Sequence, residues 1–203
     1  MKKIWLILIC VLTVGSSFAQ DEEFKTIFKK DENKKVRISG FGGPMMIFTA
    51  IGDDFAHMMG GGGGIIIGNS FFGGYGFGKT NKITYKHNDQ YNMNFGHGGF
   101  WVGHVFAPNK PIHLSLSVQT GWGNITQGIS LDDGDFEDIS SKSVFVLTPI
   151  AEIELNFSRF FILGVGSSVS YVSGSGIKDT AYTVNDFFKP SVYVSFKFGW
   201  FQK

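Results

Sequence analysis

Cysteine is almost absent from this chain of 203 residues, in which Cys10 is the only one. Residues 1–19 have the features of a secretion signal, with a basic start, an apolar stretch and small residues before the cleavage point. We therefore expect a cleavable signal peptide over residues 1–19 and a mature chain that begins at Gln20 without cysteine. This excludes a disulfide scaffold and a thiolate metal site.

Long apolar runs are also missing after residue 19, where no stretch approaches the roughly 18 to 20 apolar residues that a membrane-spanning helix needs. A helical membrane protein is therefore excluded. The formal net charge is only +1, and loss of Lys2 and Lys3 with the signal leaves 16 basic residues against 17 acidic ones. A chain without excess positive charge has no field that attracts nucleic acid, so we expect no nucleic-acid partner.

Glycine and phenylalanine are abundant instead, with 28 and 22 residues. From Val36 onward, bulky apolar residues alternate with small or polar ones at a period of two, which is typical of strands with unlike faces. In residues 112–122, for example, leucine and valine alternate with serine and glutamine. The same pattern recurs in residues 145–155, 161–171 and 187–200.

Bulky residues outside and small ones inside suit a narrow closed barrel in lipid, because about eight strands leave a lumen just wide enough for side chains. We expect strands at residues 36–49, 57–67, 71–78, 92–106, 111–125, 143–156, 160–173 and 187–201. Their connections alternate between long and short, as in bacterial outer-membrane barrels. The sequence thus predicts an all-β protein, an eight-stranded antiparallel transmembrane β-barrel with periplasmic termini, in the outer membrane of a Gram-negative bacterium.

Two prolines and one charged segment do not fit the regular strand pattern. Pro44 and Pro149 fall inside predicted strands, and because proline cannot donate a hydrogen bond we expect a β-bulge at each. Residues 20–35 carry charges of both signs, and we expect a periplasmic N-terminal tail or short helix there. Residues 36–203 then form the barrel as a single domain.

Two segments carry a resemblance to a known family: MMGGGGGIIIGNSFFGGYGFG, residues 58–78, and SVYVSFKFGWF, residues 191–201. They resemble the small bacterial outer-membrane β-barrel family of OmpA/OmpW-like architecture. The resemblance covers residues 36–203 and implies the barrel fold and the location, but it brings no functional residues. It also implies that the barrel-insertion machinery reads an aromatic residue at the end of the last strand, where Phe201 precedes Gln202 and Lys203.

Four charged residues are expected to meet inside the barrel near its periplasmic end. Glu152 and Glu154 face inward near the end of one downward strand, and Lys197 does so near the end of another. Arg37 lies at the start of the first strand. Because a buried charge needs a partner, we predict an ion-pair cluster of these four residues that closes the lumen. The alternative is that they lie in the wet mouth of the barrel and pair with water.

A second group of charges lies in the predicted outer loop, residues 126–142. It consists of Asp132, Asp133, Asp135, Glu137 and Asp138. Alternate carboxylates can bind hard cations, but the spacing is not that of an EF-hand. We interpret the loop as solvated, or as a weak divalent-cation site that bridges to lipopolysaccharide. No resident metal ion or cofactor is predicted.

The sequence contains no catalytic signature. His113 shares an inward face with Ser115 and Ser117, but no acidic residue neighbours it in sequence, so we interpret it as an interior hydrogen-bonding histidine. We predict a barrel without enzyme activity, with a filled lumen and a structural, adhesive or accessory role through its outer loops. Its predicted partners are outer-membrane lipid, lipopolysaccharide and an unidentified protein. Two alternatives remain open, namely a narrow porin-like channel or lateral-opening transporter for a small or hydrophobic solute, and a lipid-modifying barrel enzyme.

Overall fold

The computed structural model describes residues 38–85, 88–130, 136–174 and 182–201. These residues form antiparallel strands and one short helix, α3. The strands are β1 (Ile38–Ile51), β2 (Asp54–Ile67), β3 (Ser70–Lys79), β4 (Thr84–Tyr85), β5 (Asn88–Phe106), β6 (Ile112–Ser130), β7 (Phe136–Asn156), β8 (Phe161–Val169), β9 (Tyr171–Ser173) and β10 (Pro190–Gly199), and α3 is Val184–Phe187.

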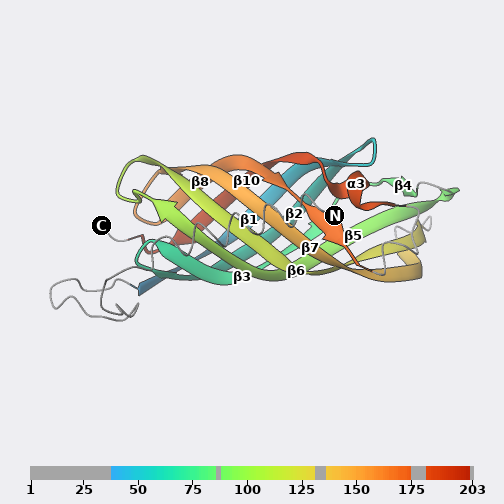
Figure 1. Ribbon diagram of the computed structural model, residues 1–203, viewed down its shortest axis with the longest axis horizontal. Helices are drawn as coiled ribbons and strands as arrows, with labels where there is room; N and C mark the ends of the chain where they lie inside the picture. Colours follow the sequence, from blue (N-terminus) through green and yellow to red (C-terminus); the bar gives the residue numbers. More distant parts are fainter. Residues whose placement is uncertain (1–37, 86–87, 131–135, 175–181, 202–203) are drawn as a thin grey trace, which may run out of the picture. The chain divides into compact units, whose positions relative to one another are not determined.

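Eight strands pair in a ring, which Figure 1 shows as a wall of oblique strands. The order is β1, β2, β3, β5, β6, β7, β8 and β10, and the pairing of β10 with β1 closes the ring. The short strand β4 adds to β5, and β9 continues the line of β8 along β7. The predicted all-β fold, an eight-stranded antiparallel barrel, is confirmed.

The two ends of the barrel differ in their connections. At the end that we call the turn end, the chain turns through residues 68–69, 107–111 and 157–160. We call the opposite end the loop end. There the predicted long connection over residues 50–56 is wrong, because β1 and β2 extend until only Gly52 and Asp53 separate them. Gly52 has a φ of +63°, a conformation that glycine adopts without strain and that permits so short a turn.

The predicted outer loop over residues 126–142 is mostly strand. β6 continues to Ser130 and β7 begins at Phe136, so their hairpin is longer than expected. Polar cross-strand contacts extend the ladder, such as the hydrogen bond of 3.3 Å from the Thr126 hydroxyl to the Ser141 hydroxyl oxygen. These residues lack the bulky alternation of the rest of the barrel, and the prediction therefore ended the strands too early.

The last strand is shorter than predicted and follows a helical turn. Helix α3 begins after Thr183, whose backbone N–H and hydroxyl both donate to Asp186 Oδ2, at 2.7 and 2.8 Å. Pro190 starts β10, a position where its missing N–H is tolerated. Among the described residues, no helix has the length and apolar character to cross a membrane.

Neither Pro44 nor Pro149 lies at a β-bulge, so that prediction is wrong. β1 pairs with β10 at Gly42 and again at Met45, in unbroken register, and Pro44 falls in the gap between them. β7 pairs with β9 up to Leu147 and with β8 from Ile150, and Pro149 falls in that gap. Each proline thus lies where one side of the strand forms no ladder bonds, and its missing donor is not required.

The predicted alternation of faces is confirmed along the four strands that showed it most clearly. On β6, for example, Leu114 and Leu116 are exposed, whereas Ser115 and Ser117 are buried. The glycine-rich strands β2 and β3 curve closely past each other. A Cβ atom on Gly60 would collide with the carbonyl oxygen of Gly76 on the neighbouring strand, so that position requires glycine.

Candidate functional site

Strands β6, β7 and β10 bring four titratable side chains together inside the barrel at its turn end. Strand pairing places His113 on β6 opposite Glu154 on β7, and Glu152 is the next inward residue of β7. Lys197 reaches them from β10, on the far side of β8. All four side chains are buried, because they occupy the inward positions of their strands. We call His113, Glu152, Glu154 and Lys197 the buried cluster.

Lys197 joins the two carboxylates. Its Nζ lies 2.6 Å from Glu154 Oε1 and 3.0 Å from Glu152 Oε2. The exposed fractions are only 5% for Lys197, 1% for Glu152 and 2% for Glu154. The Ser195 hydroxyl donates a further hydrogen bond of 2.6 Å to Glu152 Oε1. Removed from water, each charge is thus compensated by an opposite charge or a hydrogen bond, as buried ions require.

Aromatic rings cover the other side of the Lys197 ammonium group. Its Nζ lies 6.0, 5.7 and 5.2 Å from the ring centroids of Phe41, Phe71 and Trp101. The rings contact one another edge to face, with centroids 5.1 to 5.4 Å apart. Trp101 Nε1 donates to the Ser117 hydroxyl at 3.1 Å, which fixes its ring. The negative faces of aromatic rings attract a cation, so this wall stabilises the ammonium group together with the carboxylates.

His113 is confirmed as an interior hydrogen-bonding histidine, but its place in the buried cluster was not predicted. Its Nε2 lies 2.8 Å from Glu154 Oε2, and its Nδ1 lies 3.1 Å from the carbonyl oxygen of Lys110. His113 and Glu154 are far apart in sequence, but the predicted strands place both at the same end of adjacent strands. That position, two residues from the start of one strand and two from the end of the other, was the signal for their contact.

The structure brings together three of the four residues predicted to form the ion-pair cluster. Glu152, Glu154 and Lys197 are in direct contact, whereas Arg37 lies outside the described residues. The acidic residues of the predicted outer loop also lie outside the side chains that the structure describes; they are Asp132, Asp133, Asp135, Glu137 and Asp138. Among the described residues, no group of three or more histidine and acidic residues could hold a metal ion.

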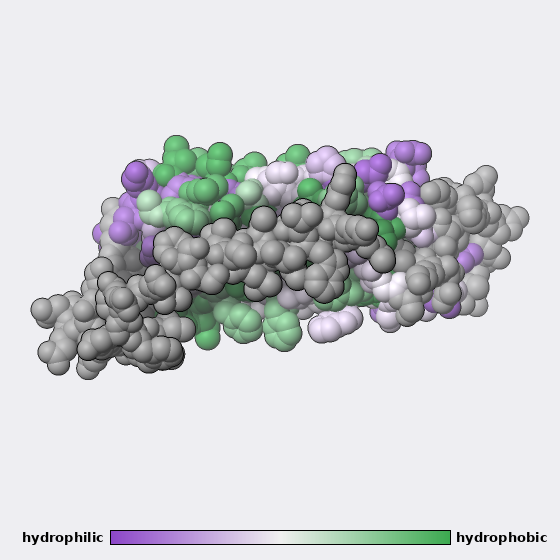
Figure 2. Space-filling view, viewed as in Figure 1, coloured by the Kyte–Doolittle hydropathy of each residue, from purple (hydrophilic) through white to green (hydrophobic). Residues whose placement is uncertain are grey.

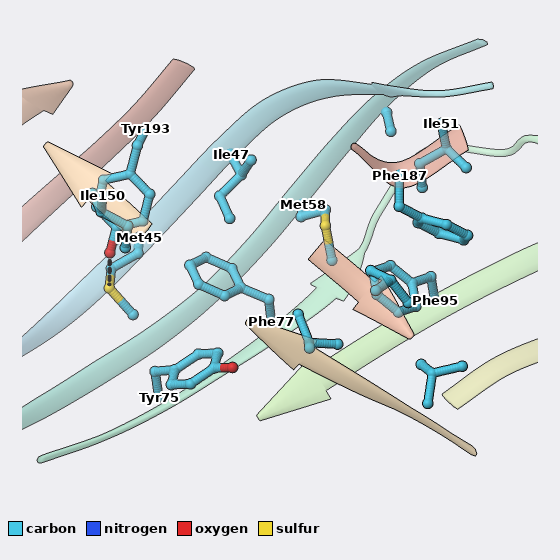
Figure 3. Packing of buried hydrophobic residues seen from close by; sticks show 14 of the residues in the cluster. Met45, Ile47, Ile51, Met58, Tyr75, Phe77, Phe95, Ile150, Phe187 and Tyr193 are labelled. Carbon is cyan, nitrogen blue, oxygen red and sulfur yellow. Dashed lines mark hydrogen bonds between the residues drawn. The ribbon is translucent and has the colours of Figure 1, made fainter. Parts of the chain in front are cut away.

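Toward the loop end, the interior of the barrel becomes apolar. Figure 3 shows Phe187 of α3 packed against Phe95, and their ring centroids are 5.2 Å apart. Nearer the buried cluster, the Tyr193 hydroxyl donates to Met45 Sδ at 2.7 Å. The buried apolar residues at this end include Ile47, Ile51, Met58, Phe77, Ile125, Val144 and Val172. The lumen therefore contains a polar layer and an apolar layer in succession.

His113 and His104 offer little for nucleophilic catalysis. Both ring nitrogens of His113 are engaged, so neither is available to take a proton from a serine. His104 Nδ1 lies 3.0 Å from the Ser70 hydroxyl on the exposed outer face. Within the described part of the chain, no carboxylate contacts this pair, and the third member that orients a catalytic histidine is therefore lacking.

Comparison with known proteins identifies the fold through structure alone. No protein-family model matches the sequence, and no curated protein matches it. Neisserial surface protein A superposes with a TM-score of 0.56 at 9% sequence identity, over 83% of this chain and 100% of that one. The N-terminal β-barrel domain of OprF from Pseudomonas aeruginosa gives 0.50 at 10% identity, over 81% and 99%.

A third solved structure is Ail, the attachment invasion locus protein of Yersinia pestis, in complex with the heparin analogue sucrose octasulfate. It gives a TM-score of 0.49 at 15% identity and covers 82% of this chain and 99% of that one. At such low sequence identities, the first two likenesses establish the fold and nothing finer. The chain has the fold of the small outer-membrane β-barrels that its sequence resembles.

Proposed function

We propose that this protein is an integral outer-membrane barrel whose lumen is filled, and that its role is structural, adhesive or accessory. Its termini and its turn end face the periplasm, and its loop end faces outward. Outer-membrane lipid and lipopolysaccharide surround it, and a protein partner binds at the loop end. The signal peptide over residues 1–19 directs the chain across the inner membrane, and the barrel-insertion machinery places it.

One observation carries this proposal, namely that the barrel has apolar side chains outside and charges inside. Ile112 is 61% exposed, whereas its neighbour His113 is 6% exposed. Ile153 is 56% exposed and lies between the buried carboxylates Glu152 and Glu154. The inward charges find partners inside the barrel in any surroundings. The outward apolar residues would be unfavourable in water and are favourable in lipid, where hydrocarbon contacts them.

The outer surface supports the same proposal. In Figure 2, apolar side chains protrude along the wall, and hydrophilic residues gather toward its two ends. Exposed aromatic residues lie near both ends, as in the girdles of membrane barrels. At the turn end they are Phe106, Phe157, Phe160 and Trp200, and at the loop end they are Phe55, Tyr171 and Phe188.

The two layers in the lumen support a barrel that does not conduct. The buried cluster and the rings of Phe41, Phe71 and Trp101 fill the turn end. Phe77, Phe95 and Phe187 fill the other end.

We also propose that the acidic residues of the β6–β7 hairpin form a weak divalent-cation site. Calorimetric titration of the protein with Ca²⁺ tests this site.

Recording from planar lipid bilayers tests the filled lumen. We expect the refolded wild-type barrel to insert without producing discrete ion-conducting steps, while a larger porin in the same bilayer produces them. Regular conductance steps from the wild-type protein would contradict the proposal and favour the narrow channel.

A lateral-opening transporter for a hydrophobic solute is the second candidate, and an interruption of the strand pairing favours it. Within the described ranges, which leave out residues 175–181, β9 pairs with β7 alone, and β10 begins at Pro190. Helix α3 contacts both β9 and β1. The Gly52 N–H, in the turn after β1, donates a hydrogen bond of 2.8 Å to the Asp186 carbonyl oxygen. Displacement of this short helix would connect the apolar interior with the lipid. Faster uptake of a hydrophobic dye into cells that produce the protein, with no conductance, would favour this candidate.

A further inference from the structure

We infer that one proton shared between His113 and Glu154 keeps the buried cluster electrically neutral, and that the stability of the barrel therefore falls as the pH rises. This inference rests on the proposed function, because it concerns the polar layer that fills the lumen.

The two hydrogen bonds of the His113 ring each require a proton, one toward Lys110 and one toward Glu154. Nδ1 lies 3.1 Å from the carbonyl oxygen of Lys110, which can only accept, so Nδ1 carries a proton. Nε2 lies 2.8 Å from Glu154 Oε2. A bond of this length needs a second proton, whether it is held by the nitrogen or by the carboxyl oxygen. Both positions give the His113–Glu154 pair the same total charge of zero.

The remaining groups of the buried cluster balance each other. Lys197 of β10 contributes one positive charge, and Glu152 of β7 accepts bonds from Lys197 and Ser195 as a carboxylate. Tyr193 of β10 also faces these carboxylates, and its hydroxyl donates to Met45 Sδ. Lys110 takes part through its backbone carbonyl. Loss of the shared proton would thus leave one net negative charge among side chains that are at most 6% exposed.

The sign of the pH effect follows from proton binding in the two states. In the unfolded chain, His113 is a free imidazole that loses its proton near about pH 6.5. In the folded barrel, the proton is held in a short hydrogen bond inside a cluster that is neutral only with it. Above about pH 6.5 the folded state therefore binds more protons than the unfolded state, and stability decreases with rising pH.

The test uses the complete mature barrel in detergent micelles and measures the urea concentration at half-unfolding at about pH 6 and about pH 9, which span the titration of imidazole. We expect the wild-type midpoint to fall between the two values. His113→Gln leaves Glu154 with the excess negative charge of the buried cluster and should have a lower midpoint at pH 6 than the wild type. The double variant His113→Gln/Glu154→Gln removes both groups that hold the shared proton, so its midpoint should exceed that of His113→Gln and should not fall between the two pH values.

His104→Gln is the matched control, because His104 is exposed on the outer face. This substitution should leave the wild-type pH dependence intact. An unchanged pH dependence in His113→Gln/Glu154→Gln would overturn the inference. Nitrogen-15 NMR of the His113 ring gives a readout that a merely structural role would not move. At about pH 6 we expect both ring nitrogens to be protonated or in strong hydrogen bonds; a bare Nε2 would also overturn it.

These results are separable from the proposed function. A barrel that conducts ions, or that does not insert into membranes, would contradict the proposed function and leave the pH dependence of His113 unaffected. A flat wild-type midpoint in a barrel that is silent in bilayers would contradict only the shared proton.

Discussion

The carboxylate of Glu152 fills the space in which Gly164 would carry a side chain. A Cβ atom on Gly164 would collide with Glu152 Oε1 and press on the Ser195 hydroxyl, while the two strands remain paired. The absence of a side chain on β8 therefore creates the room in which Lys197 of β10 meets the carboxylates of β7.

Gly164→Ala should accordingly destabilise the barrel, because the added methyl group forces Glu152 away from Ser195 and Lys197. Overpacking of this kind costs about 1 to 3 kcal/mol. Urea unfolding in micelles measures the loss. Gly76→Ala is the matched control, since a Cβ there would meet nothing within 4 Å, and it should be close to neutral. Equal effects of the two substitutions would show that Gly164 does not make room for the buried cluster.

Neutralising only one sign of charge in the buried cluster should be costly. Lys197→Met leaves Glu152 and Glu154 buried without their cation, and an unpaired buried charge destabilises by about 3 to 5 kcal/mol. Glu152→Gln/Glu154→Gln leaves Lys197 with the aromatic rings alone and should also lower the free energy of unfolding. The triple variant, which removes all three charges, should be more stable than either. If Lys197→Met unfolds at the same urea concentration as the wild type, these charges do not pair in the membrane.

The two faces of β6 should tolerate a charge differently. Leu116→Arg places a charge on the outer face and should cost about 2 to 4 kcal/mol if that position lies near the middle of the bilayer. Val194→Arg on β10 should behave in the same way. Ser117→Arg and Ser195→Arg should act through crowding of the lumen instead. Folding yields in vesicles compare them, and a wild-type yield for Leu116→Arg would mean that its face is not in lipid.

Removal of the Phe187 ring should loosen α3. Phe187→Ala leaves a cavity beside Phe95, and truncation of a buried phenylalanine costs about 3 kcal/mol or more where the surroundings do not collapse. Because α3 is short, we expect faster hydrogen exchange in α3 and at Gly52, with little change in β6 or β7. Uniformly faster exchange through the barrel would show instead that Phe187 supports the whole fold.

The barrel could be predicted from the sequence because its signal is repetitive and local. Residues such as Leu114 and Ser115 differ strongly in polarity and alternate along four of the strands, so a period of two identifies both faces there. The same logic gave Glu152, Glu154 and Lys197 as inward charges that need partners. The prediction failed where this contrast disappears, as in the polar extension of the hairpin around Thr126 and Ser141.

Other features depend on contacts that no local pattern encodes. The pairing of His113 with Glu154 needs the register of two long strands, which the predicted strand ends gave only approximately. The aromatic wall around Lys197 combines residues from three further strands. Helix α3 was missed because four residues give no periodicity, although Thr183 and Asp186 have the spacing of a capping box.

Migration of the protein on a denaturing gel, with and without boiling, tests the central claim of a closed membrane barrel most directly. A closed barrel satisfies its backbone hydrogen bonds internally and resists detergent. We expect the protein to fractionate with the outer membrane and to migrate differently before and after boiling. Recovery from the soluble periplasmic fraction, with identical migration in the two samples, would contradict the account.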